Sequence, residues 1–198
     1  MPSRRKSISP IPIASWPSAM RPAIAAMTPP NPRHRTVPHP GRPKGLNVLG
    51  TFAHHPELAH AFWTFNGHLL RATTLTERHR EMLILRVASL TKSSYEWTQH
   101  LILGRDAGLT ETEIGWIAWG SDAPSWTTED SAILKIAEDL IADHIIGDKT
   151  WETLTELLDT QQILDAIYTI GAYQTIAWMM LSFGVELDDD LKAWRYDA

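Results

Sequence analysis

The chain contains no cysteine at all. This absence excludes disulfide bonds, thiolate nucleophiles, cysteine-ligated zinc and iron–sulfur clusters from the chemistry of the protein. Nine histidines are present, but they form no H-E-x-x-H pattern and match no other ligand spacing. We therefore expect neither thiol chemistry nor a metal site.

Acidic residues are missing from the first 56 positions, which hold eight of the 18 lysines and arginines, so that all 23 acidic residues follow. Eleven of the 13 prolines lie within residues 2–43, where they prevent helix interiors and favour extended backbone. We predict that residues 1–44 form a basic, proline-rich arm without helices, dispensable for the core fold. Residues 45–198 would form one helical domain, because this length suits a single core.

A basic arm is also found in proteins that bind nucleic acids or anionic lipids. Here the basic residues are spread among prolines rather than clustered, and the acidic body offers them a partner within the same chain. Prolines also interrupt any apolar run of the kind that signal peptides need. We expect a cytoplasmic protein that binds neither nucleic acid nor membrane.

The rest of the chain carries the periodicity and capping signals of helices, and no strand-like alternation of useful length. Nine tryptophans add large side chains suited to a core or a pocket wall. The class is therefore all-α, with about six to seven helices. The expected helices are Pro56 to Arg71, Glu77 to Thr91, Ser94 to Ala107, Thr110 to Gly120 with a capping box, Thr127 or Thr128 to near Gly147, Trp151 to Leu158, and Gln161 to Phe183.

The last of these helices is apolar nearly all round, which predicts a central position or a subunit interface. Its length approaches that of a membrane span, for which about 20 predominantly apolar residues are needed. Gln161, Asp165 and Gln174 argue against a span, because such groups are costly in lipid.

Three ionisable residues lie on apolar helix faces. Glu96 and His100 are four residues apart and project from one face of a helix, and Glu81 lies on an apolar face of the preceding helix. If the two helices form a hairpin about Lys92 and Ser93, Glu81 and His100 differ in axial height by about 6 Å, which side chains can bridge. The pattern predicts that they touch or share a water molecule.

The same pattern allows a purely structural interpretation. A Glu and a His at this spacing are common on helices, and Glu81 can pair with Arg80 or Arg86. From periodicity alone, a catalytic site and a buried structural network both stay open.

The segment RHREMLILRVASLTKSSYEWTQHLILGRDAGLTETEI, residues 78–114, resembles the core motif of the carboxymuconolactone decarboxylase and alkylhydroperoxidase D superfamily. The resemblance continues through AFWTFNGHLL at 61–70 and IYTIGAYQTIAWMMLSFGVEL at 167–187. It implies an AhpD-like helical bundle that assembles as a homo-oligomer.

The resemblance also assigns positions to the family's site. In the peroxidase branch, a Cys-x-x-Cys pair would fall on Ser93 and Glu96, the histidine on His100 and the relay glutamate on Glu81. Both thiols are missing, so the peroxidase activity that the family label suggests is contradicted. In the decarboxylase branch the residue four before the histidine is glutamate, as Glu96 is here.

Decarboxylation of a conjugated lactone acid leaves a dienolate that must be stabilised and protonated, and it requires no cofactor. The resemblance therefore implies a cofactor-free lyase or isomerase acting on a small lactone or carbonyl acid. His100 would donate the proton, and Glu96 and Glu81 would orient it and tune its pKa toward neutrality. The alternative is a non-catalytic helical oligomer in which these residues form a buried network.

Three further residues are candidates for substrate binding. Arg86 could hold a substrate carboxylate, although an ordinary ion pair with a nearby acid is the competing interpretation. Tyr95 and Trp97 are bulky neighbours of Glu96 that would shape the pocket.

Overall fold

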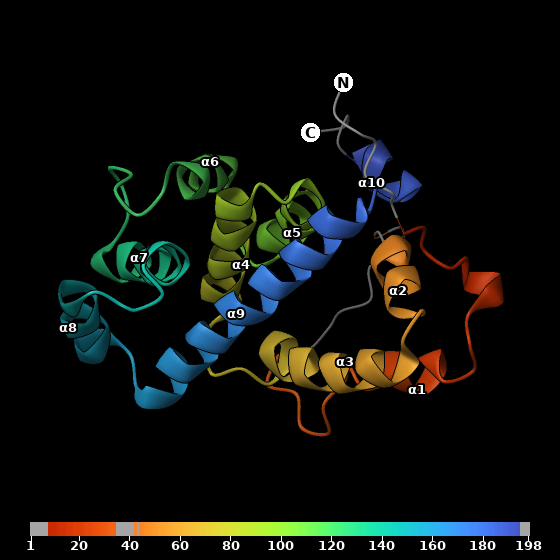
Figure 1. The fold of residues 1–198 in the computed structure, drawn as a ribbon. Coiled ribbons are helices and arrows are strands. Elements are labelled where there is room, and N and C mark those ends of the chain that lie inside the picture. Colours follow the sequence, from red (N-terminus) through yellow and green to blue (C-terminus); the bar gives the residue numbers. More distant parts are fainter. Residues whose placement is uncertain (1–7, 35–41, 43, 195–198) are drawn as a thin grey trace. The chain divides into compact units, whose positions relative to one another are not determined.

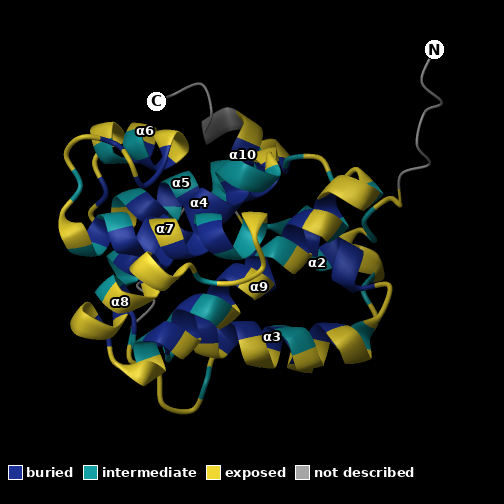
Figure 2. Cartoon of the chain, turned by 60° about the vertical axis from the view of Figure 1, so that its left-hand side comes forward, coloured by how far each residue is buried: buried dark blue, intermediate teal, exposed yellow. Residues whose placement is uncertain are grey.

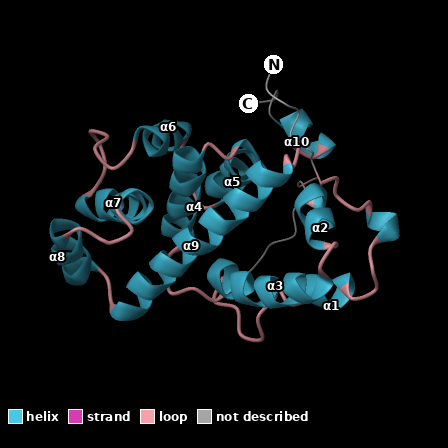
Figure 3. Cartoon of the chain, in the orientation of Figure 1, coloured by secondary structure: helices cyan, strands magenta, loops and turns pink. Residues whose placement is uncertain are grey.

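The computed structural model describes residues 8–34, 42 and 44–194, and within these residues it is helical with no strand (Figure 3). The all-α prediction is confirmed. A 3-10 helix, η1, comes first, and ten α-helices follow. The elements are η1 (Ile13–Ser15), α1 (Met20–Ala25), α2 (Leu46–Phe52), α3 (Pro56–Arg71), α4 (Glu77–Thr91), α5 (Ser94–Asp106), α6 (Glu111–Trp119), α7 (Thr128–Ala142), α8 (Asp148–Leu157), α9 (Thr160–Phe183) and α10 (Asp189–Trp194).

The seven predicted helices correspond to α3 to α9, and three short helices were not expected. The expectation that the proline-rich segment contains no helix was wrong, because α1 lies within it. Pro22 is the third residue of α1, and a first-turn proline costs a helix little because its missing N–H would have no intrahelical acceptor. The helix is only six residues long, which is too short for a periodic pattern to identify.

The chain divides into two compact units. The first unit holds the described residues up to Ala72 and from Trp178 onward, and the second unit runs from Thr73 to Ala177. Helix α9 contributes its first part to the second unit and its last residues to the first. The predicted boundary after residue 44 falls inside the first unit.

In the first unit, α1 packs on α3. Met20 and Ala23 of α1 are fully buried. The backbone that follows α1 lies so close to α3 that a Cβ placed on Gly67 would be 2.8 Å from the carbonyl oxygen of Met27. Residues of the proline-rich segment therefore form part of the packed structure of this unit.

In the second unit, α4 packs against α5, α6 and α7 (Figure 1). Ten consecutive residues of α4, from His79 to Ala88, are buried (Figure 2). The helix ends at Lys92, which adopts the left-handed conformation with φ 59°, and Ser93 N donates to the carbonyl oxygen of Ala88. This αL ending reverses the chain within two residues, so α5 begins at Ser94.

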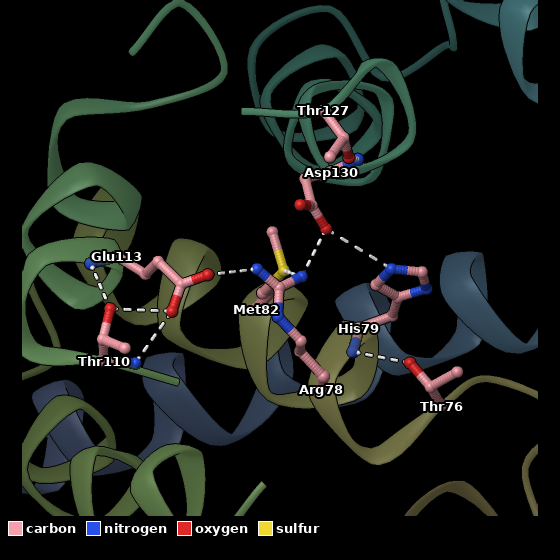
Figure 4. A network of polar contacts seen from close by, with 8 residues as sticks. All are labelled: Thr76, Arg78, His79, Met82, Thr110, Glu113, Thr127 and Asp130. Atoms are coloured by element: carbon pink, nitrogen blue, oxygen red, sulfur yellow. Dashed lines mark hydrogen bonds and ion pairs between the residues drawn. The ribbon is translucent and has the colours of Figure 1, made fainter. Parts of the chain in front are cut away.

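An ion network joins the first turns of α4, α6 and α7 (Figure 4). The Arg78 guanidinium donates to Glu113 Oε1 at 2.6 Å and also to Asp130 Oδ1. Asp130 Oδ1 lies 3.5 Å from His79 Nε2 as well. Thr110 completes the predicted capping box with Glu113. The network fixes the start of α4, the helix that carries Glu81.

Helix α9 has 24 residues and alternates buried with exposed positions. Its exposed large apolar residues are Leu164, Tyr168, Trp178 and Leu181. No helix among the described residues is both long enough and apolar enough to span a bilayer. The apolar residues of α9 are therefore divided between buried positions and an exposed stripe, and its role as a subunit interface stays a prediction.

Candidate functional site

Glu81 and His100 meet inside the second unit, as the hairpin geometry predicted. Glu81 lies on α4 and is fully buried, and His100 lies on α5 with 6% of its surface exposed. His100 Nδ1 is 2.7 Å from Glu81 Oε2. A carboxylate at this distance accepts the Nδ1 proton, so the contact favours the tautomer or imidazolium with hydrogen on Nδ1.

The second oxygen of Glu81 is also paired. Arg80 Nε donates to Glu81 Oε1 at 2.9 Å. Burial alone would raise the pKa of Glu81, but the adjacent His100 and Arg80 outweigh it and hold that pKa below its ordinary value. Glu81 is therefore an ionised carboxylate at neutral pH, held between two cationic or hydrogen-donating partners.

Glu96 is in the opposite situation. It is 3% exposed, and neither carboxyl oxygen has a hydrogen-bond partner among the described residues. The expectation that Glu96 and Glu81 both orient His100 is met only by Glu81. Burial raises the pKa of Glu96 to about 8 and outweighs the opposing effect of the nearby Ser93 hydroxyl, which forms no well-aligned hydrogen bond with it. At neutral pH this side chain is therefore a neutral carboxylic acid.

One aromatic neighbour of the site was not anticipated. The rings of His100 and Tyr173 pack edge to face with centroids 5.0 Å apart and an interplanar angle of 88°. Tyr173 lies on α9 and is 3% exposed. Because it is distant in sequence and sits in a uniformly apolar helix, periodicity gave no signal for it. It holds the imidazole plane from the side and limits its rotation.

The contacts of Arg86 argue against a role in substrate binding. Its Nε donates to Glu138 Oε1 at 3.0 Å, and its Nη1 donates to the carbonyl oxygens of Ile117 and Ala118 at 3.1 and 3.0 Å. Gly120 has φ 130°, and a Cβ there would lie 2.7 Å from Arg86 Nη2. These contacts match the ion-pair interpretation, and they cap the carboxyl end of α6.

Tyr95 and Trp97 differ in their surroundings. Tyr95 is buried, with 5% of its surface exposed. Trp97 is half-buried and forms part of the wall of a hollow of about 260 Å³ at the junction of α4 and α5. Of these two predicted neighbours, Trp97 is thus the one that lines an open space.

The arrangement of acidic and histidine side chains does not favour a metal ion at this site. Across residues 8–34, 42 and 44–194, no three histidine, aspartate or glutamate side chains are gathered as a metal ion would require. Glu81 is instead engaged by Arg80, and a guanidinium beside a carboxylate disfavours a second cation there.

Comparison with known proteins agrees with this architecture. Residues 56–139 match the model of the carboxymuconolactone decarboxylase family. A peroxidase-related protein from Ralstonia eutropha JMP134 with an alkylhydroperoxidase AhpD core has a TM-score of 0.73 at 19% identity, covering 96% of each chain. The debrominase Bmp8 in its apo form has a TM-score of 0.70 at 11% identity and covers 94% of each chain.

A further similar structure is a protein of unknown function from Agrobacterium tumefaciens, described as an AhpD-type antioxidant defence protein. It has a TM-score of 0.64 at 21% identity, covering 69% of this chain and 94% of its own. No curated protein matches the chain. The fold is that of the AhpD-like proteins, and the match over residues 56–139 supports a relationship to the carboxymuconolactone decarboxylase family.

Proposed function

We propose that the protein is a cofactor-free enzyme, a lyase or isomerase, that transfers protons to and from a small lactone or carbonyl acid. The observation that carries this proposal is the contrast between two buried glutamates, Glu81 and Glu96, that both precede His100 in the sequence. Glu81 is held ionised by its partners, whereas burial keeps Glu96 protonated. Buried carboxyl groups with pKa values driven apart are characteristic of acid–base sites.

His100 is the proton donor in this proposal. Its Nδ1 is occupied by Glu81, and among the described residues Nε2 has no hydrogen-bond partner, so this nitrogen can face a substrate. The Glu81 carboxylate stabilises the imidazolium form, which can then give the Nε2 proton to a carbanionic carbon. The arrangement follows the same logic as a carboxylate that orients a catalytic histidine in hydrolases.

Glu96 supplies a hydrogen-bond donor on the same face of α5. A neutral carboxyl group can donate to the oxygen of a developing enolate, whereas an ionised one would repel it. In a decarboxylation the bond to the leaving carboxylate breaks, its electron pair enters the conjugated system as a dienolate, and CO2 departs. A proton from His100 then goes to carbon, and solvent returns a proton to the histidine.

A second candidate is a non-catalytic role, favoured by the two contacts that Glu81 makes. A buried carboxylate bound by Arg80 and His100 is also what a structural network would contain. Such a network, however, gives no reason for Glu96 to be buried without a hydrogen-bond partner. Thiol-dependent peroxide reduction is not proposed, because the chain has no cysteine.

The test is turnover of a panel of lactones and keto acids in D2O, followed by mass spectrometry of the products. We expect substrate-dependent product formation with one solvent deuterium placed on carbon, and loss of that activity in His100→Gln. A wild-type protein that processes no member of the panel, or variants with unchanged turnover, would leave the structural network as the better description.

A further inference from the structure

The hollow of about 260 Å³ in the second unit lies where α4 gives way to α5. Its volume is slightly below the range of about 300 to 1,000 Å³ that is typical of small-molecule sites, so it suits a small ligand. It is lined by Ala88, Ser89, Lys92, Ser93, Ser94, Trp97 and Ala118. Lys92 is the one charged residue of this lining, and Trp97 is its one aromatic residue.

Ser93 is the unusual member of this lining. It is 1% exposed, and its hydroxyl has no hydrogen-bond partner among the residues that the structure describes. It occupies the N-cap position of α5, yet its side chain makes no capping hydrogen bond. The nearby Glu96 carboxyl is affected by this hydroxyl, but no aligned hydrogen bond joins the two groups. A buried hydroxyl without such a bond costs free energy, and one that lines a hollow can bind a ligand.

The electrostatics of the hollow favour an anion. Helix α5 has 13 residues, and the N–H groups of its first turn and its dipole favour negative charge at this end. Lys92, an exposed residue in the lining, adds a positive charge at the same end of the helix. The backbone at the helix start, the Ser93 hydroxyl and the Lys92 ammonium together form a set of donors without a carboxylate among the lining residues.

We propose that this hollow binds the carboxylate of a small planar acid, with the carboxylate at the start of α5 beside Lys92 and Ser93 and the planar part against Trp97. The inference deepens the proposed function and rests on it for the claim that the ligand is the substrate. Glu96 follows Ser93 by about one helical turn on α5, so the hollow lies next to one of the proposed proton-transfer residues in the chain. The hollow thereby narrows the ligand class to small planar carboxylates of about the size of benzoate.

Binding is measured with benzoate as the probe, by calorimetry and by chemical-shift perturbation of the backbone amides of residues 92–97. Benzamide tests the need for charge, and inorganic phosphate tests whether any anion suffices. We expect benzoate to shift the Ser93 and Trp97 signals, with benzamide and phosphate binding at least about tenfold more weakly, as the loss of a charge-assisted or planar contact implies.

Two variants localise the site. Lys92→Asn removes the charge but keeps a residue that tolerates the left-handed conformation, and Ser93→Ala removes the hydroxyl. Each should weaken benzoate binding, Lys92→Asn by about tenfold or more. The matched controls are Lys149→Asn and Ser125→Ala, at exposed positions elsewhere in the second unit, which should bind benzoate like the wild type.

The outcomes separate this inference from the proposed function. Benzoate binding that is unchanged in both Lys92→Asn and Ser93→Ala overturns the site, as do equal affinities for benzamide or phosphate. Benzoate binding to the wild type that shifts only amide signals outside residues 92–97 also overturns the site. This measurement does not depend on whether the variants fold. If His100→Gln keeps turnover while benzoate still binds here, the proton-transfer proposal fails and the carboxylate site stands.

Discussion

His100 Nδ1 lies 2.7 Å from Glu81 Oε2, although the two residues are 19 positions apart and belong to different helices. The contact depends on the two-residue link between α4 and α5, because one further residue would rotate the face of α5 by about 100°. It also leaves Nε2 as the nitrogen of His100 that can exchange a proton. The local chain reversal at Lys92 thus determines which atom of the imidazole can act.

His100→Gln should lower turnover by about 10² to 10⁴, the usual contribution of a positioned acid or base. Glutamine has a similar size and can still donate to Glu81, so the melting temperature should change little. The measurement is turnover beside thermal unfolding. His79→Gln is the matched control, since His79 is also buried in the second unit but contacts Asp130 instead. Equal losses of turnover in both variants would contradict the assignment.

Glu96→Gln should change how stability depends on pH. Burial raises the pKa of Glu96 from 4.5 to about 8 in the folded state. The folded state thus retains a proton that the unfolded state releases between these two values. The contribution of Glu96 to stability is therefore greatest below pH 4.5 and falls as pH rises toward 8, by up to about 1.4 kcal/mol per pH unit.

The variant cannot ionise at this position, so its free energy of unfolding should fall less steeply between pH 5 and 8. Glutamine should stabilise the protein relative to wild type at pH 8. Denaturant unfolding at several pH values measures both slopes, and Glu152→Gln, at an exposed position on α8, is the control. Parallel wild-type and variant slopes would mean that Glu96 is ionised in the folded protein.

Sequence reasoning succeeded where local rules determine the outcome. Capping residues and apolar periodicity placed α3 to α9, and the short link at Lys92 predicted the meeting of Glu81 with His100. It could not find Tyr173, because that contact comes from a distant helix whose apolar pattern gives it no preferred face. Nor could it foresee that Glu96 lacks a partner, since the surroundings of a buried group depend on every element packed around it.

A chain that begins at residue 45 should be less stable than the full chain, contrary to what the proline content suggested. It would lose α1, and with it Met20 and Ala23, whose buried apolar surface covers α3. Exposing α3 in this way costs about 25 cal/mol per Å² of apolar surface. The measurement is thermal unfolding followed by circular dichroism, with removal of residues 1–7 alone as the control. Equal melting temperatures for all three chains would restore the view that the segment is dispensable.

The exposed apolar stripe of α9 should be covered by a second copy of the chain, giving a homo-oligomer. Leu164 and Tyr168 are 49% and 56% exposed, one helical turn apart, and Trp178 follows further along the helix at 60%. Large exposed apolar side chains that gather on one helix are characteristic of interaction sites. Tyr168→Lys should shift the mass from light scattering toward the monomer, whereas Leu157→Lys on α8 should not. A monomeric wild type at micromolar concentration would refute this.

Glu81→Gln should affect both stability and activity, and the two effects have different causes. The pKa of Glu81 is held below its ordinary value despite burial, because His100 and Arg80 favour the charged form. Its ionisation therefore contributes stability that is fully present above pH 4.5, the ordinary value, and is lost as pH falls through the lower folded value. A neutral amide forfeits this contribution and leaves Arg80 and His100 less well paired, at a cost of about 1 to 3 kcal/mol.

Turnover should fall as well, since an amide no longer stabilises the imidazolium of His100. Denaturant unfolding at pH 7 gives the first effect, and turnover of the folded variant at the same pH gives the second. If Glu81→Gln lost stability while its turnover stayed that of the wild type, Glu81 would be a structural residue and His100 would act without it.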